Sequence, residues 1–397
     1  MGDVRCSSIG ELCDAGGASL QTGPFGSQLH ASDYVEDGVP VVPTEALVDG
    51  RIDHDLLPMI TTGKARELSR HELSAGDIVF ARRGVQATGR TSRIGRAEDG
   101  FIGGTGIIRL RIHAERAPVT PDFMAWVLRS PDSVAWLKHH AIGATMPNLN
   151  EGIIRTVPVP LVPIREQHRI AGILSAFDDK IELNRRMATT LEGLARAAYA
   201  ELQASLSDEC SAGSIADVAF NPRDQVDPRQ VDPSTPYIGL EHVPRGRLVL
   251  GEWGQAVNAE SGKLAFQRND VLFGKLRPYF RKVGVVPTSG ICSTDIIVIR
   301  ARRPEDLGYV LAVATDAAFI EASNAASTGT RMPRTSWSDL LRYQLLIPPM
   351  SARAAFTKRV WPLIERAQAA ASENSTLEQV RDTLLPRLLS GDIELAT

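Results

Sequence analysis

Residues 163–202 read PIREQHRIAGILSAFDDKIELNRRMATTLEGLARAAYAEL, and this stretch decides the plan of the chain. Apolar residues recur in steps of three and four, which is the seam pattern of a coiled-coil helix. At 1.5 Å per residue, about 40 residues form a rod roughly 60 Å long. One polar residue, Asn184, lies inside the seam, where it weakens packing but can fix register. Because a single seam needs a partner helix, the pattern predicts a second rod. The seam residues are Ile170, Leu174, Phe177, Ile181, Asn184, Ala188, Leu191, Ala195, Ala198 and Leu202.

The second rod is expected in the same chain. An offset of 186 carries Thr190-Leu191-Glu192 onto Thr376-Leu377-Glu378. The second seam is less regular, because Pro362 interrupts it and Arg381 occupies one of its positions. Two unrelated amphipathic helices, each packed on its own domain, are the simpler alternative. The shared offset over roughly 60 ungapped residues instead favours a tandem duplication. The second seam consists of Phe356, Val360, Leu363, Ala367, Ala370, Asn374, Leu377, Arg381, Leu384 and Leu388.

Length and composition describe an ordinary globular protein. The 397 residues are enough for two or three domains with real cores. The four cysteines form no CxxC pair or close cluster, which favours free thiols in a reducing cytosol and disfavours structural zinc. The N-terminus lacks a signal-peptide core and no run of 18 apolar residues occurs. We therefore expect a cytoplasmic protein. The net charge of −3 is unusual for a nucleic-acid binder, so the distribution of charge decides more than its sum.

The regions outside the rods predict mixed α/β structure. In residues 1–162 we expect strands at 39–42, 78–80 and 100–112, and a helix over 122–139. Asp49-Gly50 predicts a turn. Residues 206–348 repeat this plan in shorter form. Gly76-Asp77-Ile78-Val79-Phe80 aligns with Asn269-Asp270-Val271-Leu272-Phe273 at an offset of 193. The order is therefore domain 1–162, rod 163–205, domain 206–348 and rod 349–397. The predicted fold class is α+β, with two mixed domains and two long coiled-coil helices in a tandem duplication.

Two basic segments stand at equivalent places in the copies. Residues 78–97 and 271–294 contain no aspartate or glutamate, although the chain as a whole is acidic. Lysine and arginine can neutralise phosphates, and arginine or glutamine can reach base edges. The alternative is a solvated loop whose arginine stems cover apolar surface. Symmetric placement favours nucleic acid. The predicted DNA-binding residues are Arg82, Arg83, Gln86, Arg90, Arg93, Lys275, Arg277, Tyr279, Arg281 and Lys282.

Motifs for catalysis are missing from the sequence. There is no phosphate-binding GxxxxGK[ST] loop and no GxSxG nucleophile motif. The glycines of 101–106 precede a strand rather than a helix, so a turn is favoured over a nucleotide site. His139-His140 lacks a third ligand at suitable spacing, which favours a helix end over a metal site. We therefore expect no catalytic residues, no metal and no cofactor in this chain.

In this order, several segments resemble the specificity (S) subunit of type I restriction–modification systems over nearly the whole chain. They are Thr22 to Ser27, Gly76-Asp77-Ile78, Pro160 to Gln167 with the rod that follows, Asp270 to Tyr279, and Leu384 to Gly391. The sequence departs from the pattern in the second rod, where Ser351-Ala352-Arg353 replaces the Glu-Gln found at Glu166-Gln167.

The resemblance implies that residues 1–162 and 206–348 are two target-recognition domains, separated by two long antiparallel coiled-coil helices in a pseudo-two-fold arrangement. Each domain would read one half of a bipartite, non-palindromic DNA site. The helices would act as a ruler and dock two methyltransferase (M) subunits, which use S-adenosylmethionine. Motor-nuclease (R) subunits would join in the full complex, and the chain itself would be non-catalytic. Two other functions stay open: a specificity subunit of another methylation-based defence system, and a coiled-coil scaffold that never binds DNA.

Overall fold

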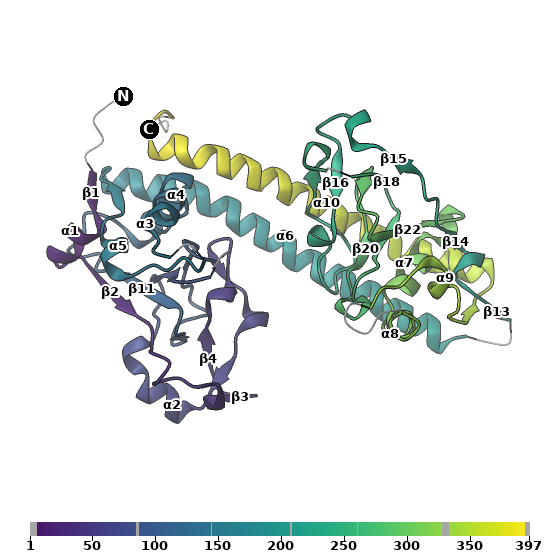
Figure 1. The fold of residues 1–397 in the computed structure, drawn as a ribbon, viewed down its shortest axis with the longest axis horizontal. Coiled ribbons are helices and arrows are strands. Elements are labelled where there is room, and N and C mark those ends of the chain that lie inside the picture. The colour runs from purple at the N-terminus through teal and green to yellow at the C-terminus, as the bar shows by residue number, and fades with distance from the viewer. Residues whose placement is uncertain are drawn as a thin grey trace. The chain divides into compact units, whose positions relative to one another are not determined.

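The computed structural model describes residues 6–84, 87–143, 145–206, 209–259, 261–327 and 333–393. The chain divides into two compact units, one of Met1–Phe177 with Val380–Thr397 and one of Asp178–Gln379. Two long helices, α6 (Ile164–Ala204) and α10 (Met350–Leu389), contribute one part to each unit (Figure 1). Both predicted rods are therefore helices. Within the described ranges, no helix is long and apolar enough to cross a bilayer.

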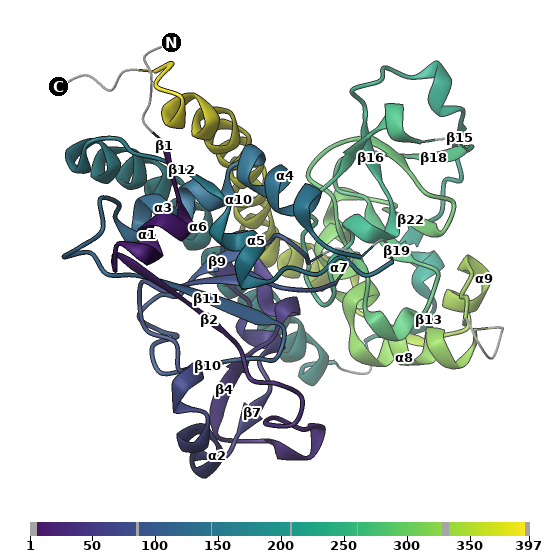
Figure 2. The same ribbon diagram turned by 60° about the vertical axis from the view of Figure 1, so that its left-hand side comes forward.

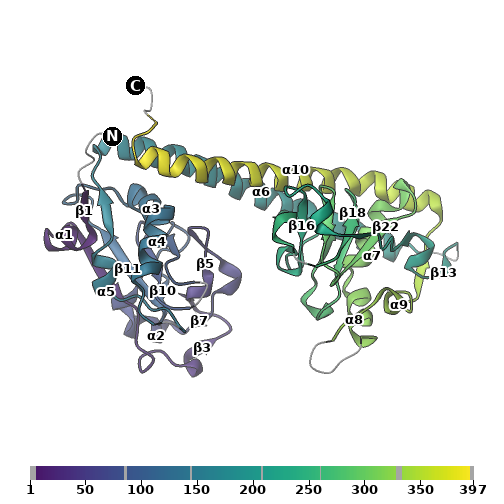
Figure 3. The ribbon, with the colours of Figure 1, turned by 45° about the horizontal axis from the view of Figure 1, so that its top comes forward.

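In each unit the parts of α6 and α10 pair in opposite directions (Figure 3). In the second unit, Asn184 contacts Asn374 and Glu201 contacts Arg359, so residue numbers rise along one helix as they fall along the other. In the first unit, Ile170 shares a buried apolar cluster with Leu388. α10 runs unbroken through Pro362, so the irregular seam does not end the helix. The predicted antiparallel helix pair is confirmed.

The first unit is built around a sheet of strand order β2-β11-β8-β9, in which β2 and β11 lie side by side (Figure 2). A second sheet has the order β10-β4-β7-β3, with β10 and β4 parallel. The strands of the first unit are β1 (Cys6–Ser8), β2 (Ala18–Thr22), β3 (Tyr34–Val35), β4 (Val39–Val42), β5 (Leu47–Val48), β6 (Arg51–Ile52), β7 (Met59–Ile60), β8 (Ile78–Ala81), β9 (Thr91–Arg93), β10 (Ile102–Gly103), β11 (Ile107–Ile112) and β12 (Pro158–Pro160). Its shorter helices are α1 (Ile9–Asp14), α2 (Thr62–Glu67), α3 (Pro121–Arg129), α4 (Pro131–His140) and α5 (Glu151–Arg155).

Two predicted elements of the first unit are corrected. The helix expected over 122–139 is two helices, because Ser130 leaves the helical conformation and caps α4 while Pro131 occupies its first turn. The strand expected over 100–112 is two strands, β10 and β11. Between them Gly104 passes so close to β4 that a Cβ would lie 2.7 Å from the carbonyl oxygen of Val42. The predicted turn at Asp49-Gly50 is confirmed, since both residues have positive φ between the paired strands β5 and β6.

The second unit repeats this plan. Its central sheet has the order β14-β22-β19-β20, and its second sheet, β15-β18-β21-β16-β17, again contains one parallel pair. Its strands are β13 (Ser211–Gly213), β14 (Ala219–Phe220), β15 (Gln225–Val226), β16 (Pro236–Ile238), β17 (Gly254–Gln255), β18 (Lys263–Phe266), β19 (Val271–Gly274), β20 (Val283–Val285), β21 (Gly290–Cys292), β22 (Ile296–Ala301) and β23 (Leu345–Ile347). Its shorter helices are α7 (Leu307–Thr315), α8 (Ala317–Ala325) and α9 (Trp337–Leu340).

The duplication extends to single contacts. Asp316 caps α8 and stands 186 residues after Ser130, which caps α4, so the same break separates the helices of both pairs. The predicted α+β fold with a tandem duplication is confirmed.

The start of each long helix is fastened to its own domain by an equivalent residue. The side chain of Gln167 donates to the carbonyl of Val162 at 2.9 Å and accepts from the backbone N–H of Thr120 at 2.8 Å. Arg353 stands 186 residues later, where the sequence departs from the family pattern. It donates to the carbonyl of Pro348 and to the carboxylate of Asp306, which are the positions equivalent to Val162 and Thr120. The second copy therefore keeps the fastening and changes its chemistry from a neutral amide to an ion pair.

Candidate nucleic-acid interface

A buried ion pair fixes the strand that leads into each basic segment. Asp77, which is 2% exposed, immediately precedes β8 and accepts two hydrogen bonds from Arg111 of β11, both at 2.7 Å. In the second copy Asp270 accepts from Arg300 at 2.8 and 2.7 Å. In each pair, hydrogen bonding to the carboxylate raises the pKa of the arginine. Such two-point pairs are rigid, so both loops begin from a fixed position.

The backbone before each pair has the same unusual conformation. Gly76 has a φ of +95° and Asn269, its equivalent, has a φ of +73°. Asparagine is among the few side chains that tolerate this left-handed region. The Gly76-Asp77 and Asn269-Asp270 motifs therefore form the same local structure in the two copies.

In the first unit, Arg82 and Arg83 lie directly after β8. The Nε of Arg82 donates to the side chain of Asn148 at 3.2 Å, and the guanidinium of Arg83 donates to the hydroxyl of Thr105 at 3.2 Å. Arg83 is exposed and Arg82 is half-buried. Both bonds are to neutral groups, so both arginines keep their positive charge for a ligand. The predicted residue Gln86 lies outside the described residues.

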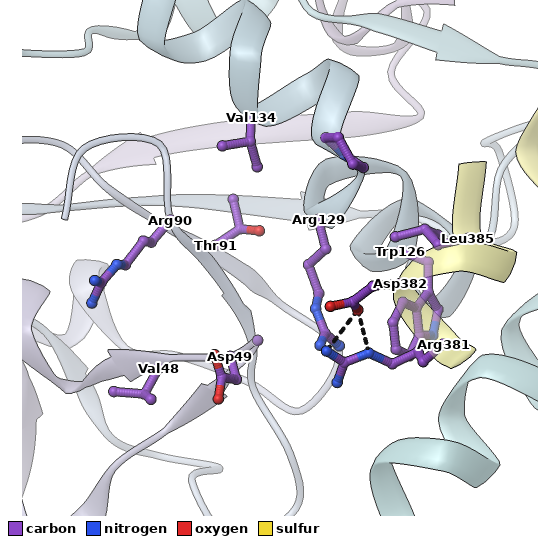
Figure 4. Close-up of a pocket in the computed structure, with 12 residues that line it drawn as sticks. Val48, Asp49, Arg90, Thr91, Trp126, Arg129, Val134, Arg381, Asp382 and Leu385 are labelled. Carbon is purple, nitrogen blue, oxygen red and sulfur yellow. Dashed lines mark hydrogen bonds and ion pairs between the residues drawn. The ribbon is translucent and has the colours of Figure 1, made fainter. Parts of the chain in front are cut away.

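Arg90 and Arg93 differ in what surrounds them. Arg93 forms an ion pair with Asp122 at 2.6 Å, which offsets its charge. Arg90 is exposed and lines a cavity of about 420 Å³ with Arg129 and Arg381 (Figure 4). Arg381 is paired there with Asp382, so the irregular seam position is explained by an ion pair. Of these predicted residues, Arg90 is better placed than Arg93 to meet an anion.

In the second unit, Arg277 and Arg281 flank the 3₁₀ turn Pro278–Phe280 and are both left-handed, with φ of +49° and +51°. Left-handed backbone at residues other than glycine is strained and clusters at functional sites. The turn presents Tyr279, which is 50% exposed, and its ring packs edge-on against Phe280 at 4.7 Å. An exposed aromatic ring between two arginines suits stacking on a base or packing against a sugar.

The two predicted lysines point inward instead. The ammonium of Lys275 donates to the carbonyl of Thr294, and that of Lys282 donates to the carbonyl of Leu240. Burial lowers the pKa of both lysines. The structure therefore separates the predicted residues of this loop into an outward group, Tyr279 and Arg281, an inward group of two lysines, and Arg277, which is half-buried.

Other cations, absent from the sequence prediction, adjoin this turn. The guanidinium of Arg245 stacks on the ring of Phe280 at 4.0 Å. Arg196 of α6 donates to the carbonyl of Gly246. Partial desolvation lowers the pKa of Arg196, Glu192 opposes that shift, and repulsion from Arg247 and Arg281 adds to it. Proximity of these groups could not be read from the sequence, because they come from elements far apart along the chain. The Pro-Arg-Gly-Arg run at 244–247 was the only local signal.

Among the described residues, no group of three or more His, Cys, Asp or Glu side chains is arranged to hold a metal ion. The four cysteines are free thiols. His140 stacks on Trp136 at 4.3 Å and bonds to its carbonyl, which is a helix-end arrangement.

Comparisons with known proteins give one family. Residues 7–192 match the family described as type I restriction modification DNA specificity domain. The chain is 21% identical to the type I restriction enzyme MjaIX specificity subunit of Methanocaldococcus jannaschii, over 70% of each chain. It is 23% identical to the HindI specificity subunit of Haemophilus influenzae, over 82% of this chain and 88% of that one. The crystal structure of the type I S subunit from M. genitalium covers 100% of this chain and 98% of its own, with 15% identity and a TM-score of 0.55, a likeness of fold.

Proposed function

Because the chain belongs to the type I restriction modification DNA specificity family and is a DNA sequence-specificity subunit, we propose that each of its two units reads one half of a bipartite, non-palindromic DNA target. The observation that carries this proposal is that both units share the same sheet and ion pair, whereas the loops that follow the ion-paired strand differ in sequence. The Asp77–Arg111 and Asp270–Arg300 pairs match in geometry, whereas the loops that follow present different side chains. Equal frames with unequal loops would recognise unequal half-sites.

The recognition domains of this proposal are residues 1–162 and 206–348, and the spacers are residues 163–205 and 349–397. The paired helices would hold the half-sites about one helical turn of DNA apart, and would dock two methyltransferase (M) subunits. Motor-nuclease (R) subunits would complete the assembly, in the cytoplasm. The chain itself would bind no cofactor and catalyse nothing, and S-adenosylmethionine would be bound by the M subunits.

The exposed arginines support DNA as the ligand. Arg83 and Arg90 in the first unit and Arg281 in the second are exposed, and Tyr279 adds an aromatic surface beside Arg281. The modest overall charge of −3 fits a subunit that shares its phosphate contacts with partners. We propose Arg82, Arg83, Gln86, Arg90, Arg93, Lys275, Arg277, Tyr279, Arg281 and Lys282 as the DNA-binding set, with the outward members contacting DNA directly.

The test uses the chain assembled with its M subunits and maps the methylated sites. Tyr279→Ala with Arg281→Asn should relax recognition at one half-site, and Arg83→Gln should affect only the other. Asparagine at 281 tolerates the left-handed backbone. Loss of a base contact costs about 1–3 kcal/mol at one position, whereas loss of a phosphate contact weakens all sequences alike. The matched control is Arg342→Asn, an exposed arginine of the second unit.

Three results would contradict the proposal. If the variants of both units changed recognition of the same half-site, the assignment of one half-site to each unit would be wrong. Methyl transfer by the lone chain would show that it is catalytic. A complex assembled with M subunits that never binds duplex DNA, with no methylated site in the host, would favour the scaffold function.

A further inference from the structure

The second unit contains a cavity of about 510 Å³ whose lining does not include the exposed turn at Tyr279. Its polar lining comes mainly from Asn221 to Gln225 after β14, Lys275 after β19, and Arg334 to Asp339 around the start of α9; Leu264, Thr294 and Ile297 complete it. Three of the lining residues are cations, Arg223, Lys275 and Arg334, against one carboxylate, Asp339. The carboxylate of Asp339 already has hydrogen-bond partners, because it accepts from the backbone N–H and the hydroxyl of Ser336.

The cations converge closely enough to affect one another. Burial lowers the pKa of Lys275, and repulsion from Arg334 and Arg223 lowers it further, while Asp295 acts in the opposite direction. Arg334 forms an ion pair with Asp295 at 2.6 Å, which offsets one charge. Arg223 has a left-handed backbone, with φ of +53°, and makes no ion pair within the described part of the chain. The cavity therefore keeps an excess of positive charge.

Two residues that line this cavity, Asn221 and Thr335, each carry a buried polar atom without a partner among the described residues. The hydroxyl of Thr335, a residue only 1% exposed, makes no hydrogen bond. The side-chain oxygen of Asn221 also makes none, and rotation of that amide would present an N–H instead. A buried polar group without a partner is costly, so native proteins leave few of them. These two groups have the chemistry to complete the coordination of an anion.

The first unit shows what fills the equivalent space. There the carboxylate of Glu151 accepts from the backbone N–H of Thr22 at 3.0 Å and from its hydroxyl at 2.7 Å. The offset of 186 places Trp337 at the position of Glu151. Thr22 lies opposite Ile108 in the sheet. In the second copy the equivalent pairing ends with Phe220 opposite Arg300, and Arg223 follows three residues later, where it lines the cavity together with Ile297. The first copy supplies its own carboxylate, whereas the second has tryptophan at that position and an arginine, Arg223, beside it in the lining of the cavity.

We propose that this cavity binds a phosphate group, held by Arg223, Arg334 and the hydroxyl of Thr335 in the place that Glu151 fills in the other copy. The inference rests on the proposed function for its first source of phosphate, a phosphodiester of bound DNA. Free phosphate has the same chemistry and is the second source. Lys275 contributes charge from inside the protein rather than a direct contact with bases.

The test compares the full-length chain with Arg223→Gln and Thr335→Val. Valine has nearly the shape of threonine, so it removes the hydroxyl and little else. The control is Arg268→Gln, which makes the same charge change at an exposed residue that does not line the cavity. Inorganic phosphate is titrated against chloride at equal ionic strength, with the thermal midpoint as readout. Phosphate should raise the midpoint of the wild type and control and have little effect on either cavity variant.

A second arm measures binding of a 30-base-pair duplex across a range of salt concentrations. Loss of one phosphate contact should lower the slope of log K against log salt by about 0.9 in Arg223→Gln, with no such change in the control. If both arms respond, the phosphate belongs to DNA. If only inorganic phosphate responds, the site takes free phosphate and the DNA source is wrong.

The inference is overturned if the wild type binds the duplex while both cavity variants match it in salt slope and in response to phosphate. A chain that responds to phosphate in the predicted way but binds no duplex at all would contradict the proposed function and leave the anion site standing. The two failures are therefore distinguishable.

Discussion

Asn184 of α6 donates its side-chain N–H to the side-chain oxygen of Asn374 of α10, at 2.9 Å. Asn374 in turn donates to the carbonyl of Ile181 at 3.2 Å, and both asparagines are buried. The offset of 186 carries Asn184 onto Ala370 and Ala188 onto Asn374, so the two asparagines are not equivalent positions. The pair can form only between the first helix and the second. It fixes both register and partner choice, which is the best-attested use of a polar residue in an apolar seam.

Asn184→Ala should destabilise the second unit, because the side-chain oxygen of Asn374 would remain buried without its donor. The expected loss is about 1–3 kcal/mol in the free energy of unfolding. Urea denaturation followed by circular dichroism measures it. Leu183→Ala, at an exposed neighbour in the same helix, is the control and should change stability by less than about 0.5 kcal/mol. Equal losses in both variants would mean that the asparagine pair contributes nothing specific.

A fragment of residues 1–205 should form an antiparallel dimer, because its first helix keeps an apolar seam without a partner. In that dimer Asn184 would face Ala188 of the other copy, since Ala188 is the equivalent of Asn374. Ala188→Asn should therefore tighten the dimer. Two restored pairs at about 1 kcal/mol each correspond to roughly 30-fold in the dissociation constant. Sedimentation equilibrium checks this, with exposed Thr189→Asn as control.

With M subunits, that dimer should methylate an inverted repeat of one half-site, because an isologous dimer presents the same reading surface twice. A fragment that stays monomeric both with and without Ala188→Asn would show that the two helices are not interchangeable.

Arg353→Gln should be strongly destabilising on its own. Asp306 is 2% exposed, and removing its partner leaves a buried carboxylate uncompensated, at a cost of about 3–5 kcal/mol. The double variant Arg353→Gln with Asp306→Thr recreates the pair found at Gln167 and Thr120. It should recover most of the loss. A double-mutant cycle on the urea midpoints gives the coupling, and additive losses would refute the equivalence of the two fastenings.

Cys292 should resist alkylation in the native protein. Burial raises the pKa of its thiol to about 12, so at pH 8 almost no reactive thiolate is present. Cys6 is exposed and should react first. Mass spectrometry after iodoacetamide treatment, with and without urea, separates the two sites. Because a raised pKa keeps the thiol neutral when folded, protection should weaken only as pH approaches 12 or as the unit unfolds.

Periodicity predicted the frame of the protein well. The seam from Ile170 to Leu202 is one continuous helix, and the Asp77 and Asp270 motifs mark equivalent strands. Such features repeat at fixed spacing, so sequence alone reveals them. The break between α3 and α4 was missed, although Ser130-Pro131 is a helix-start signal that the apolar pattern on both sides obscured.

The functional surface was less predictable. The sequence shows which residues are charged, but it does not show which groups those charges pair with in the fold. Arg93 and Lys275 belong to acid-free segments, yet one pairs with Asp122 and the other donates to a carbonyl. The cavity around Thr335 was invisible for the same reason. Its polar groups come from segments separated by more than a hundred residues, and only folding brings them together.

The fastening of each long helix limits how such genes can recombine. A crossover that joined the domain of residues 1–162 to the helix that begins before Arg353 would place the guanidinium of Arg353 beside Thr120, which carries no carboxylate to pair with it. The reciprocal product would leave Asp306 facing the amide of Gln167. Recombinants should therefore survive mainly when each domain is inherited together with the first turn of the helix that follows it, which makes that first turn part of the heritable cassette.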